Sequence, residues 1–507
     1  MSVDHLVLRR AATGSRFPPR GLEVITVCQP GAVATPSTDD ERALVAVVGG
    51  GIAGLAAAWQ LSQVPGGPRV VVLESSALVG GKLRVGDLDG VSVDLGAEAV
   101  LARRPEAVDL ARAVGIGAHL VSPRPGGARV WSHGALRPLP TGTLMGVPSR
   151  PDGLLGLVGQ QDVDAVTAEP SVTWPPLAGD VDVASFIAGR VGRGIVERLV
   201  EPLLGGVYAG RADRLSLRGT VPGLWAAAAE GRSVVTAAAA ASAGAATRTP
   251  VFAGLRGGVG RLPGAVAAAL AARGVDVLTG STVRDLQRTP AGWRLVVGPT
   301  TDEQVIDAEA VVLATPAGPT SRLLVGQSPN AATHLAGIEY ASVAIVSLLV
   351  PRAHAALLPG SGFLVPPVEG RFVKAATFSS SKWAWLDESD ADRVVLRTSV
   401  GRHGDITDLQ RDDDELVQLA VTDLAGLLGA PLRVLSSSVT RWGGGLPQYA
   451  VGHLDRVAAA RAALAPGLAL AGAAYDGVGI AACIASGTRA ALAVATHLER
   501  AATAARQ

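Results

Sequence analysis

Three glycines near the start of the chain have the spacing of a turn that binds a dinucleotide. Gly49, Gly51 and Gly54 follow a β-branched run and precede a segment with helical spacing. The first glycine permits a sharp turn, the second lets a pyrophosphate approach the backbone, and the third lets the helix pack on the strand. The helix N-terminus then offers N–H donors and partial positive charge to the phosphates.

Glu74 lies twenty residues after Gly54, at the end of the next predicted strand. A carboxylate there can accept hydrogen bonds from both ribose hydroxyls of an adenosine and would repel a 2′-phosphate, which leaves NAD and FAD open. Gly80 and Gly81 then suit a backbone that wraps the diphosphate of an extended dinucleotide, and Lys82 adds a positive charge. This order of motifs favours FAD and matches flavoproteins with two dinucleotide-binding domains.

A second glycine turn lies near the C-terminus. Gly477 and Gly479 follow a predicted strand at 468–471 and open a helix at Ile480. Backbone N–H groups at a helix start can stabilise negative charge on the N1–C2 carbonyl region of a reduced flavin. No cysteine precedes these glycines, because Cys483 falls inside the helix, so the sequence predicts non-covalent FAD.

The elements that position these motifs define an α/β fold. Predicted buried strands at 44–48 and 69–73 flank a helix at 52–63, which begins a parallel Rossmann-type sheet. A low-complexity Ala/Ser/Thr segment, 237–249, is predicted to be a mobile loop. The predicted domains are a flexible N-terminal extension or misassigned start (1–43), a discontinuous FAD-binding domain (44–105, 250–330 and 431–500), a largely helical inserted domain (106–249) and a substrate-binding domain with an antiparallel sheet (331–430).

Composition excludes several function classes. Lys and Arg number 45 against 44 Asp and Glu, a net charge of +1, which argues against a nucleic-acid partner. Two cysteines, Cys28 and Cys483, exclude a disulfide framework and favour a cytoplasmic location. The eight histidines form no zinc motif, so no metal site is predicted. The sequence contains no run of 18 apolar residues, so no transmembrane segment is predicted.

With these motifs in place, the chain resembles the protoporphyrinogen/coproporphyrinogen oxidase family, most nearly the form found in Gram-positive bacteria. The similarity extends from about Leu44 to about Leu498. Amine oxidases and desaturases share only the first and last motifs. The blocks that carry the resemblance are 144–148, 200–210, 215–217, 440–442 with 446–453, and 477–480 with Cys483 and Ile484.

The resemblance implies an amine-oxidase-like flavoprotein and a set of FAD contacts. A proline usually follows the glycine at position 96 in the family, so Ala97 predicts a less rigid loop here. The implied contacts are Gly49, Gly50, Gly51, Ile52, Ala53, Gly54, Glu74, Ser75, Lys82, Gly96, Ala97, Glu98, Ala99, the backbone of Val283, Trp442, Val478, Gly479 and Ile480.

The implied activity is the oxidation of coproporphyrinogen III to coproporphyrin III in haem biosynthesis, with dioxygen as acceptor and hydrogen peroxide as product. The substrate's propionates require cations at the rim of an apolar site. Arg103, Arg104 and Lys382 are the candidates, and extra cations favour coproporphyrinogen because it carries more propionates than protoporphyrinogen. The sequence identifies no catalytic base.

Three other readings stay open. The first is a protoporphyrinogen IX oxidase, and the second is another flavin amine oxidase or desaturase. The third is a cofactor-free binding protein on the same fold, against which the intact glycine motifs argue. Peripheral membrane contact by the helical domain and transient contact with a downstream chelatase are further possibilities, although no basic amphipathic stretch requires the former.

Overall fold

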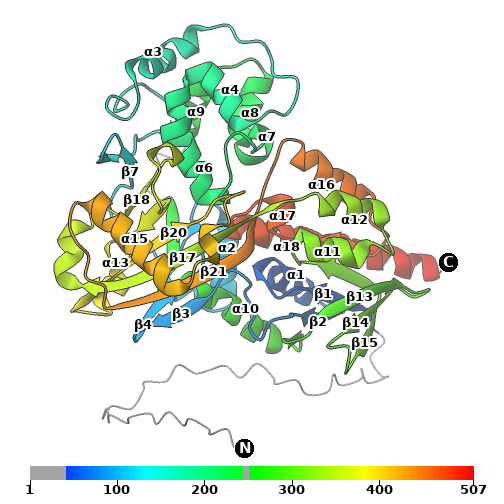
Figure 1. Cartoon of the computed structure of the whole chain (residues 1–507). Coiled ribbons are helices and arrows are strands. Elements are labelled where there is room, and N and C mark those ends of the chain that lie inside the picture. Colours follow the sequence, from blue (N-terminus) through cyan, green and yellow to red (C-terminus); the bar gives the residue numbers. More distant parts are fainter. Residues whose placement is uncertain (1–41, 244–249, 507) are drawn as a thin grey trace, which may run out of the picture.

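The computed structural model describes residues 42–243 and 250–506, so nearly all of the predicted N-terminal extension, 1–43, lies outside the described residues. Figure 1 shows a parallel sheet with its helices, a second sheet beside it, and a group of helices above both.

The parallel sheet is buried on both faces, as its apolar strands predict. Every neighbouring pair of strands is parallel. Val45 and Val47 pack on the side of helix α1, whereas Ala46 and Val48 pack on the opposite side. In spatial order the strands are β12 (Asp276–Leu278), β2 (Arg69–Leu73), β1 (Leu44–Val48), β16 (Ala310–Leu313) and β22 (Leu468–Leu470).

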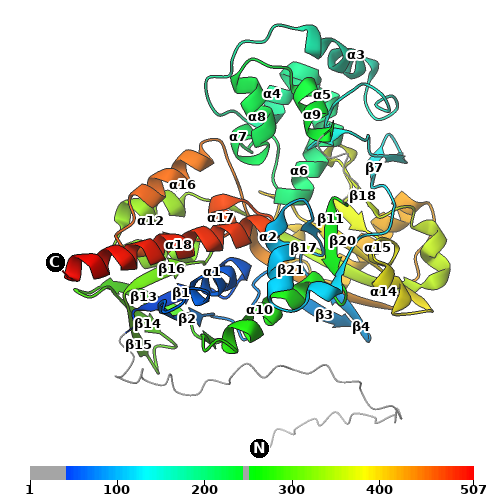
Figure 2. The ribbon, with the colours of Figure 1, turned by 180° about the vertical axis from the view of Figure 1, so that it is seen from behind.

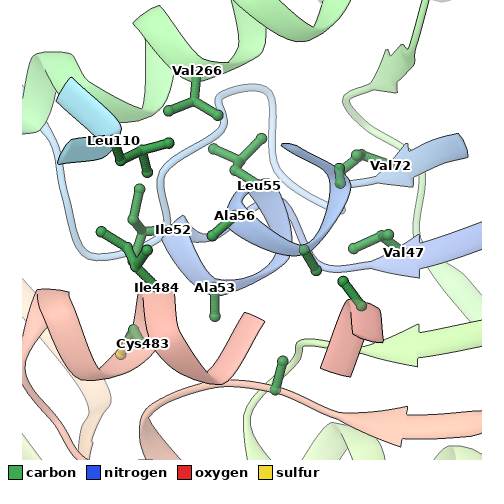
Figure 3. Packing of buried hydrophobic residues seen from close by; sticks show 14 of the residues in the cluster. Val47, Ile52, Ala53, Leu55, Ala56, Val72, Leu110, Val266, Cys483 and Ile484 are labelled. Carbon is green, nitrogen blue, oxygen red and sulfur yellow. The ribbon is translucent and has the colours of Figure 1, made fainter. Parts of the chain in front are cut away.

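Helix α1 (Ile52–Ser62) lies against the last helix, α18 (Ile480–Ala505), on one face of this sheet (Figures 1 and 2). A side chain at Gly487 of α18 would place its Cβ 2.1 Å from the Ala53 carbonyl oxygen, so this contact requires glycine. Figure 3 shows Ile52 beside Ile484, and Ala53 pointing toward the helix that carries Cys483 and Ile484. Among the described residues, one stretch, Ile480–Ala504, is long and apolar enough to cross a membrane, and half of its apolar window is buried inside the protein.

A second, seven-stranded sheet is larger than the predicted substrate domain. Strands β7 and β8 come from the segment predicted to be helical, and β21 comes from the segment assigned to the FAD-binding domain. Helix α15 (Asp413–Leu428) covers one face of this sheet. In spatial order its strands are β21 (Ser436–Pro447), β17 (Tyr340–Pro351), β20 (Arg393–Val400), β19 (Ala375–Thr377), β18 (Gly362–Leu364), β7 (Arg129–Ser132) and β8 (Ala135–Pro138).

The helical domain packs around its own apolar core. The prediction of a mobile loop at 237–249 is wrong for residues 237–243, because they complete helix α9 (Val234–Ala243). Alanine has the highest helix propensity, and Val234, Val235 and Ala238 are buried in this core. Residues 244–249 lie outside the described residues. The other helices here are α3 (Gln160–Ala168), α4 (Val183–Val191), α5 (Arg193–Ile195), α6 (Glu201–Tyr208), α7 (Leu217–Thr220) and α8 (Pro222–Ala229).

Shorter elements connect these three regions. The remaining strands are β3 (Val85–Leu88), β4 (Val91–Asp94), β5 (Val100–Leu101), β6 (Leu120–Val121), β9 (Thr143–Leu144), β10 (Val147–Pro148), β11 (Phe252–Leu255), β13 (Val283–Arg288), β14 (Trp293–Val297) and β15 (Gln304–Ala308). The remaining helices are α2 (Pro105–Ala113), α10 (Leu262–Ala271), α11 (Ala317–Leu324), α12 (Pro329–Ala336), α13 (Ser379–Lys382), α14 (Ala384–Glu388), α16 (His453–Ala462) and α17 (Ala473–Asp476).

Candidate cofactor and substrate site

In the N-terminal glycine turn, two glycines lie close to neighbouring backbone atoms, whereas the third faces open space. Gly49 has φ +109°, and a Cβ there would lie 2.9 Å from the Ala314 carbonyl oxygen. A Cβ at Gly54 would lie 1.9 Å from the Gly49 carbonyl oxygen. By contrast, a Cβ at Gly51 would meet no atom of the described residues within 4 Å. The space in front of Gly51 therefore fits the diphosphate predicted from the sequence.

The two long helices beside this turn begin without a capping side chain. Gly51 is the N-cap of α1 and Gly479 is the N-cap of α18, and neither helix start receives a side-chain cap from the described residues. A Cβ at Gly479 would also meet no described atom within 4 Å. Uncapped helix starts leave N–H donors and partial positive charge for an anionic ligand. Ile52, Ala53, Val478 and Ile480 lie at these two starts, as the predicted contacts require.

Glu74 holds the first glycine turn in place. Its Oε2 accepts from the Gly50 N–H at 2.8 Å, and its Oε1 accepts from the N–H and the hydroxyl of Ser76, each at 2.8 Å. A carboxylate offers about four lone-pair sites, so Oε2 can still accept from a ribose hydroxyl. The Ser75 hydroxyl lies 3.4 Å from Oε1, and Val283 begins β13 two residues after Ser281, whose N–H donates to the Glu74 carbonyl.

Lys82 supplies a positive charge without a partner. Its ammonium makes no hydrogen bond or ion pair within residues 42–243 and 250–506. Burial lowers the pKa of Lys82, and the nearby Cys483 opposes that shift only weakly. Burial also raises the pKa of the Cys483 thiol to about 11, so the thiol is neutral. A half-buried cation without a counter-ion fits an anionic ligand such as a diphosphate.

The loop at 95–99 is tied to the second sheet. The Trp442 indole donates to the Leu95 carbonyl at 2.9 Å, and Arg397 donates to the Gly96 carbonyl at 2.6 Å. A Cβ at Gly96 would lie 2.0 Å from the Lys82 carbonyl oxygen, so only glycine fits there. These contacts hold the loop directly before Ala97, the position at which the sequence predicted lower rigidity.

Glu98 lies at the centre of a buried ion-pair cluster. Its Oε1 accepts from Lys382 Nζ at 2.8 Å and from the Trp383 indole at 3.2 Å, and its Oε2 accepts from Ser379 and Arg397, each at 3.0 Å. Burial favours a raised pKa, but the charges of Lys382 and Arg397 outweigh it and lower the pKa of Glu98 to about 2. All four lone-pair sites of the Glu98 carboxylate are occupied. We therefore expect Glu98 to contact the cofactor through its backbone, and we expect the same of Ala99 beside it.

The three predicted substrate cations lie near one another but in different states. Arg103 is exposed and makes no hydrogen bond or ion pair among the described residues. Arg104 pairs with Glu106 on the surface. Lys382 is neutralised by Glu98, and its Nζ lies 5.7 Å from the ring centroid of Phe252, which pairs with Leu101 two residues before Arg103.

Tyr449 holds the C-terminal glycine turn, and the sequence did not identify it as a positioning residue. The Tyr449 hydroxyl accepts from the Gly477 N–H at 2.6 Å and donates to the Ala473 carbonyl at 2.7 Å. Its ring lies 5.7 Å from that of Tyr208 at the end of α6 and stacks on His453 at 3.9 Å. Burial raises the pKa of Tyr449, so its hydroxyl remains a neutral donor and acceptor.

The buried His453 should make stability depend on pH. Its Nε2 lies 3.0 Å from the Ala474 carbonyl oxygen, and burial lowers the pKa of His453 from 6.5 to about 4. The neutral form therefore contributes stability that is fully present above pH 6.5 and is lost as the pH falls through about 4. We expect a loss of about 3 kcal/mol in the free energy of unfolding.

Urea unfolding between pH 4 and pH 7.5 measures this loss, with His453→Phe as the comparison because phenylalanine keeps the stacked ring without the titrating group. The difference in the free energy of unfolding between the wild type and His453→Phe should decrease steadily as the pH falls below 6.5. An identical pH slope for both would show that another group carries the dependence.

The parallel sheet, the two open glycine turns and the unpaired Lys82 define an FAD-dependent oxidoreductase of the two-dinucleotide-binding-domain class. The family model described as flavin containing amine oxidoreductase matches residues 52–495. A crystal structure of a putative protoporphyrinogen oxidase from Exiguobacterium sp. 255-15 superposes with a TM-score of 0.79 at 28% identity, over 90% of this chain and 99% of that one.

Curated relatives narrow the assignment. The coproporphyrinogen III oxidase of Mycobacterium tuberculosis is 37% identical over 89% of this chain and 97% of its own length. The protoporphyrinogen oxidase of Macaca fascicularis is 32% identical over 89% of this chain and 98% of its own length. The chain belongs to the flavin-containing amine oxidoreductase family and, within it, to the protoporphyrinogen/coproporphyrinogen oxidases.

Proposed function

We propose that this protein oxidises coproporphyrinogen III to coproporphyrin III, with dioxygen as the electron acceptor and hydrogen peroxide as the second product. The observation that carries the proposal is the 37% identity to the Mycobacterium tuberculosis coproporphyrinogen III oxidase over nearly its whole length. A place in haem biosynthesis, a cytoplasmic location and transient contact with a downstream chelatase follow from the same proposal.

Bound FAD supplies the hydride acceptor for a methylene bridge of the porphyrinogen, and the protein supplies position and charge. Gly51, Gly479 and Lys82 would hold the anionic parts of the cofactor through backbone N–H groups at the two helix starts and one ammonium. Tyr449 fixes the Gly477 turn and thereby the position of the α18 N-terminus. The N–H groups of that helix start would then stabilise negative charge on the reduced flavin. The pyrrole N–H proton passes to solvent or to a nearby base, and we assign no side chain as that base.

A protoporphyrinogen IX oxidase is the second candidate, because the macaque protoporphyrinogen oxidase is 32% identical over 98% of its length. Aerobic oxidation of both porphyrinogens by the purified protein, followed by porphyrin fluorescence and peroxide release, separates the two. A preference for coproporphyrinogen supports the first proposal and a preference for protoporphyrinogen the second. If a yellow, reducible protein oxidises neither porphyrinogen, both proposed functions are overturned. Amines and polyenes would then be the substrates to test.

Arg103 and Arg104 form a matched pair for testing the rim cations. Arg103→Ala should raise the Kd of coproporphyrin III by about three- to tenfold, because an unpaired guanidinium is free to bind a propionate. Arg104→Ala should change it by less than about twofold, because that guanidinium is already paired with Glu106. Fluorescence titration of the FAD-loaded enzyme measures both. Equal effects of the two substitutions would remove Arg103 as a specific contact.

A further inference from the structure

One buried lysine has no role in the cofactor site. Lys374 is the single charged residue in the apolar stretch 372–378 and is 7% exposed. Its backbone N–H donates to the Ser399 carbonyl and its own carbonyl accepts from Val365, which fixes it between β20 and β18. Its ammonium makes no hydrogen bond or ion pair in the part of the chain that the structure describes.

The electrostatic surroundings of Lys374 are positive. Burial, together with the nearby charge of Arg402, lowers the pKa of Lys374 to about 7. Arg402 donates to the Val365 carbonyl at 3.1 Å, so both cations lie at the same end of β18. The carboxylates of Glu201 and Asp405 act on Arg402, and Glu201 also accepts from the Ala212 N–H at 2.7 Å. A buried cation that faces a second cation is costly unless an anion joins it.

Helix α6 connects this pair of cations to the flavin end of the cofactor site. A Cβ at Gly205 would lie 3.2 Å from Arg402 Nη1. Tyr208, three residues further along α6, faces Tyr449, which holds Gly477. One helical turn advances about 5.4 Å. The Arg402 guanidinium therefore lies beside α6 about one turn before Tyr208, and Lys374 is linked to Arg402 through Val365, whose N–H donates to the Lys374 carbonyl and whose carbonyl accepts from Arg402.

We propose that Lys374, supported by Arg402, binds a carboxylate of the substrate and thereby selects for the porphyrinogen with more propionates. This inference rests on the proposed function, because a propionate is the anion that such a substrate would bring to this place. An ammonium–carboxylate pair satisfies both partners when they are buried together, whereas a vinyl group at the same position would leave Lys374 unpaired.

Lys374→Met tests the proposal, because methionine keeps the length of the side chain without the charge. We expect the Kd of coproporphyrin III for the FAD-loaded enzyme to rise at least about tenfold, which is the loss of one charge-assisted hydrogen bond. The Kd of coproporphyrin III tetramethyl ester should not change, since the ester offers no carboxylate. Lys374→Arg should retain most of the affinity for the acid.

Two readouts separate this role from a structural one. Removal of a buried unpaired charge should leave the Tm unchanged or raise it, and FAD content should be preserved. Arg371→Gln, three residues away and exposed, is the matched control, and its Kd should stay within about twofold of the wild type.

Equal affinity of wild type and Lys374→Met for the acid overturns the inference, as does a loss shared by the acid and the ester. A lower Tm with loss of FAD in both Lys374→Met and Lys374→Arg would assign a structural role and also overturn it. Failure of the wild type to oxidise either porphyrinogen, with Lys374-dependent binding of the acid intact, overturns the proposed function alone.

Discussion

Replacing Gly51 by valine is expected to give a folded protein that holds no FAD. Gly51 has φ −68° and ψ 170°, a conformation that any residue adopts, so the backbone tolerates the change. The new side chain would point into the space in front of the α1 N-terminus, where no described atom lies within 4 Å of a Cβ. That space is where the diphosphate must approach the backbone. Flavin absorbance of the purified protein should fall at least about tenfold, while the circular dichroism spectrum is unchanged.

Gly54→Ala provides the contrast. Its Cβ would lie 1.9 Å from the Gly49 carbonyl oxygen, so the strand and the helix must separate before the side chain fits. We expect this variant to lose both FAD and thermal stability, whereas Gly51→Val loses FAD alone. A yellow Gly51→Val protein with a normal flavin content would contradict the placement of the diphosphate at this turn.

Replacing Glu98 by glutamine should produce the largest loss of stability of any single charge removal in the second sheet. The change leaves Lys382 and Arg397, whose side chains are 16% and 8% exposed, without their shared counter-ion. Breaking a buried ion pair by removing one partner costs about 3–5 kcal/mol. Flavin content should also fall. Arg397 pairs with Glu98 and also donates to the Gly96 carbonyl, so the loss of the Glu98 charge should disturb the position of the 95–99 loop. Chemical denaturation and flavin absorbance measure the two effects.

The control for Glu98→Gln is Glu106→Gln, which removes the partner of Arg104 on the surface and should cost less than about 1 kcal/mol. The double variant Glu98→Gln with Lys382→Met should cost less than the sum of the two single changes, since it removes one charge of each sign. Strict additivity of the two changes would contradict a shared ion pair.

The cofactor half of the site could be predicted because its signals are local in sequence. Gly49 to Gly54 lie within one turn, and Glu74 follows at the end of the next strand, so spacing alone predicted that they lie side by side. The second sheet could not be predicted in full, because β17 pairs with β21 and β18 pairs with β7 across long sequence separations. Pairings of that kind depend on tertiary packing and have no local pattern.

The charged residues of the site also include some that could be predicted from local sequence and some that could not. Lys382 was predicted as a free rim cation, but its partner Glu98 is 284 residues away in the chain, and no spacing rule connects the two. Lys374 was missed, although a single lysine in the apolar stretch 372–378 was a visible signal. A single charge inside an apolar stretch is a signal comparable to a motif, because burial of an unpaired charge is rarely tolerated without a function.

The order of strands in the parallel sheet has a consequence for how the protein is made. Strand β22 and helix α18 complete a sheet whose first strand begins at Leu44, so the first and last parts of this domain are translated more than 400 residues apart. At typical elongation rates of about 5–20 residues per second, α1 emerges from the ribosome tens of seconds before α18 can cover it. During that time the apolar face of α1 that packs on α18 in the finished domain is without its covering helix.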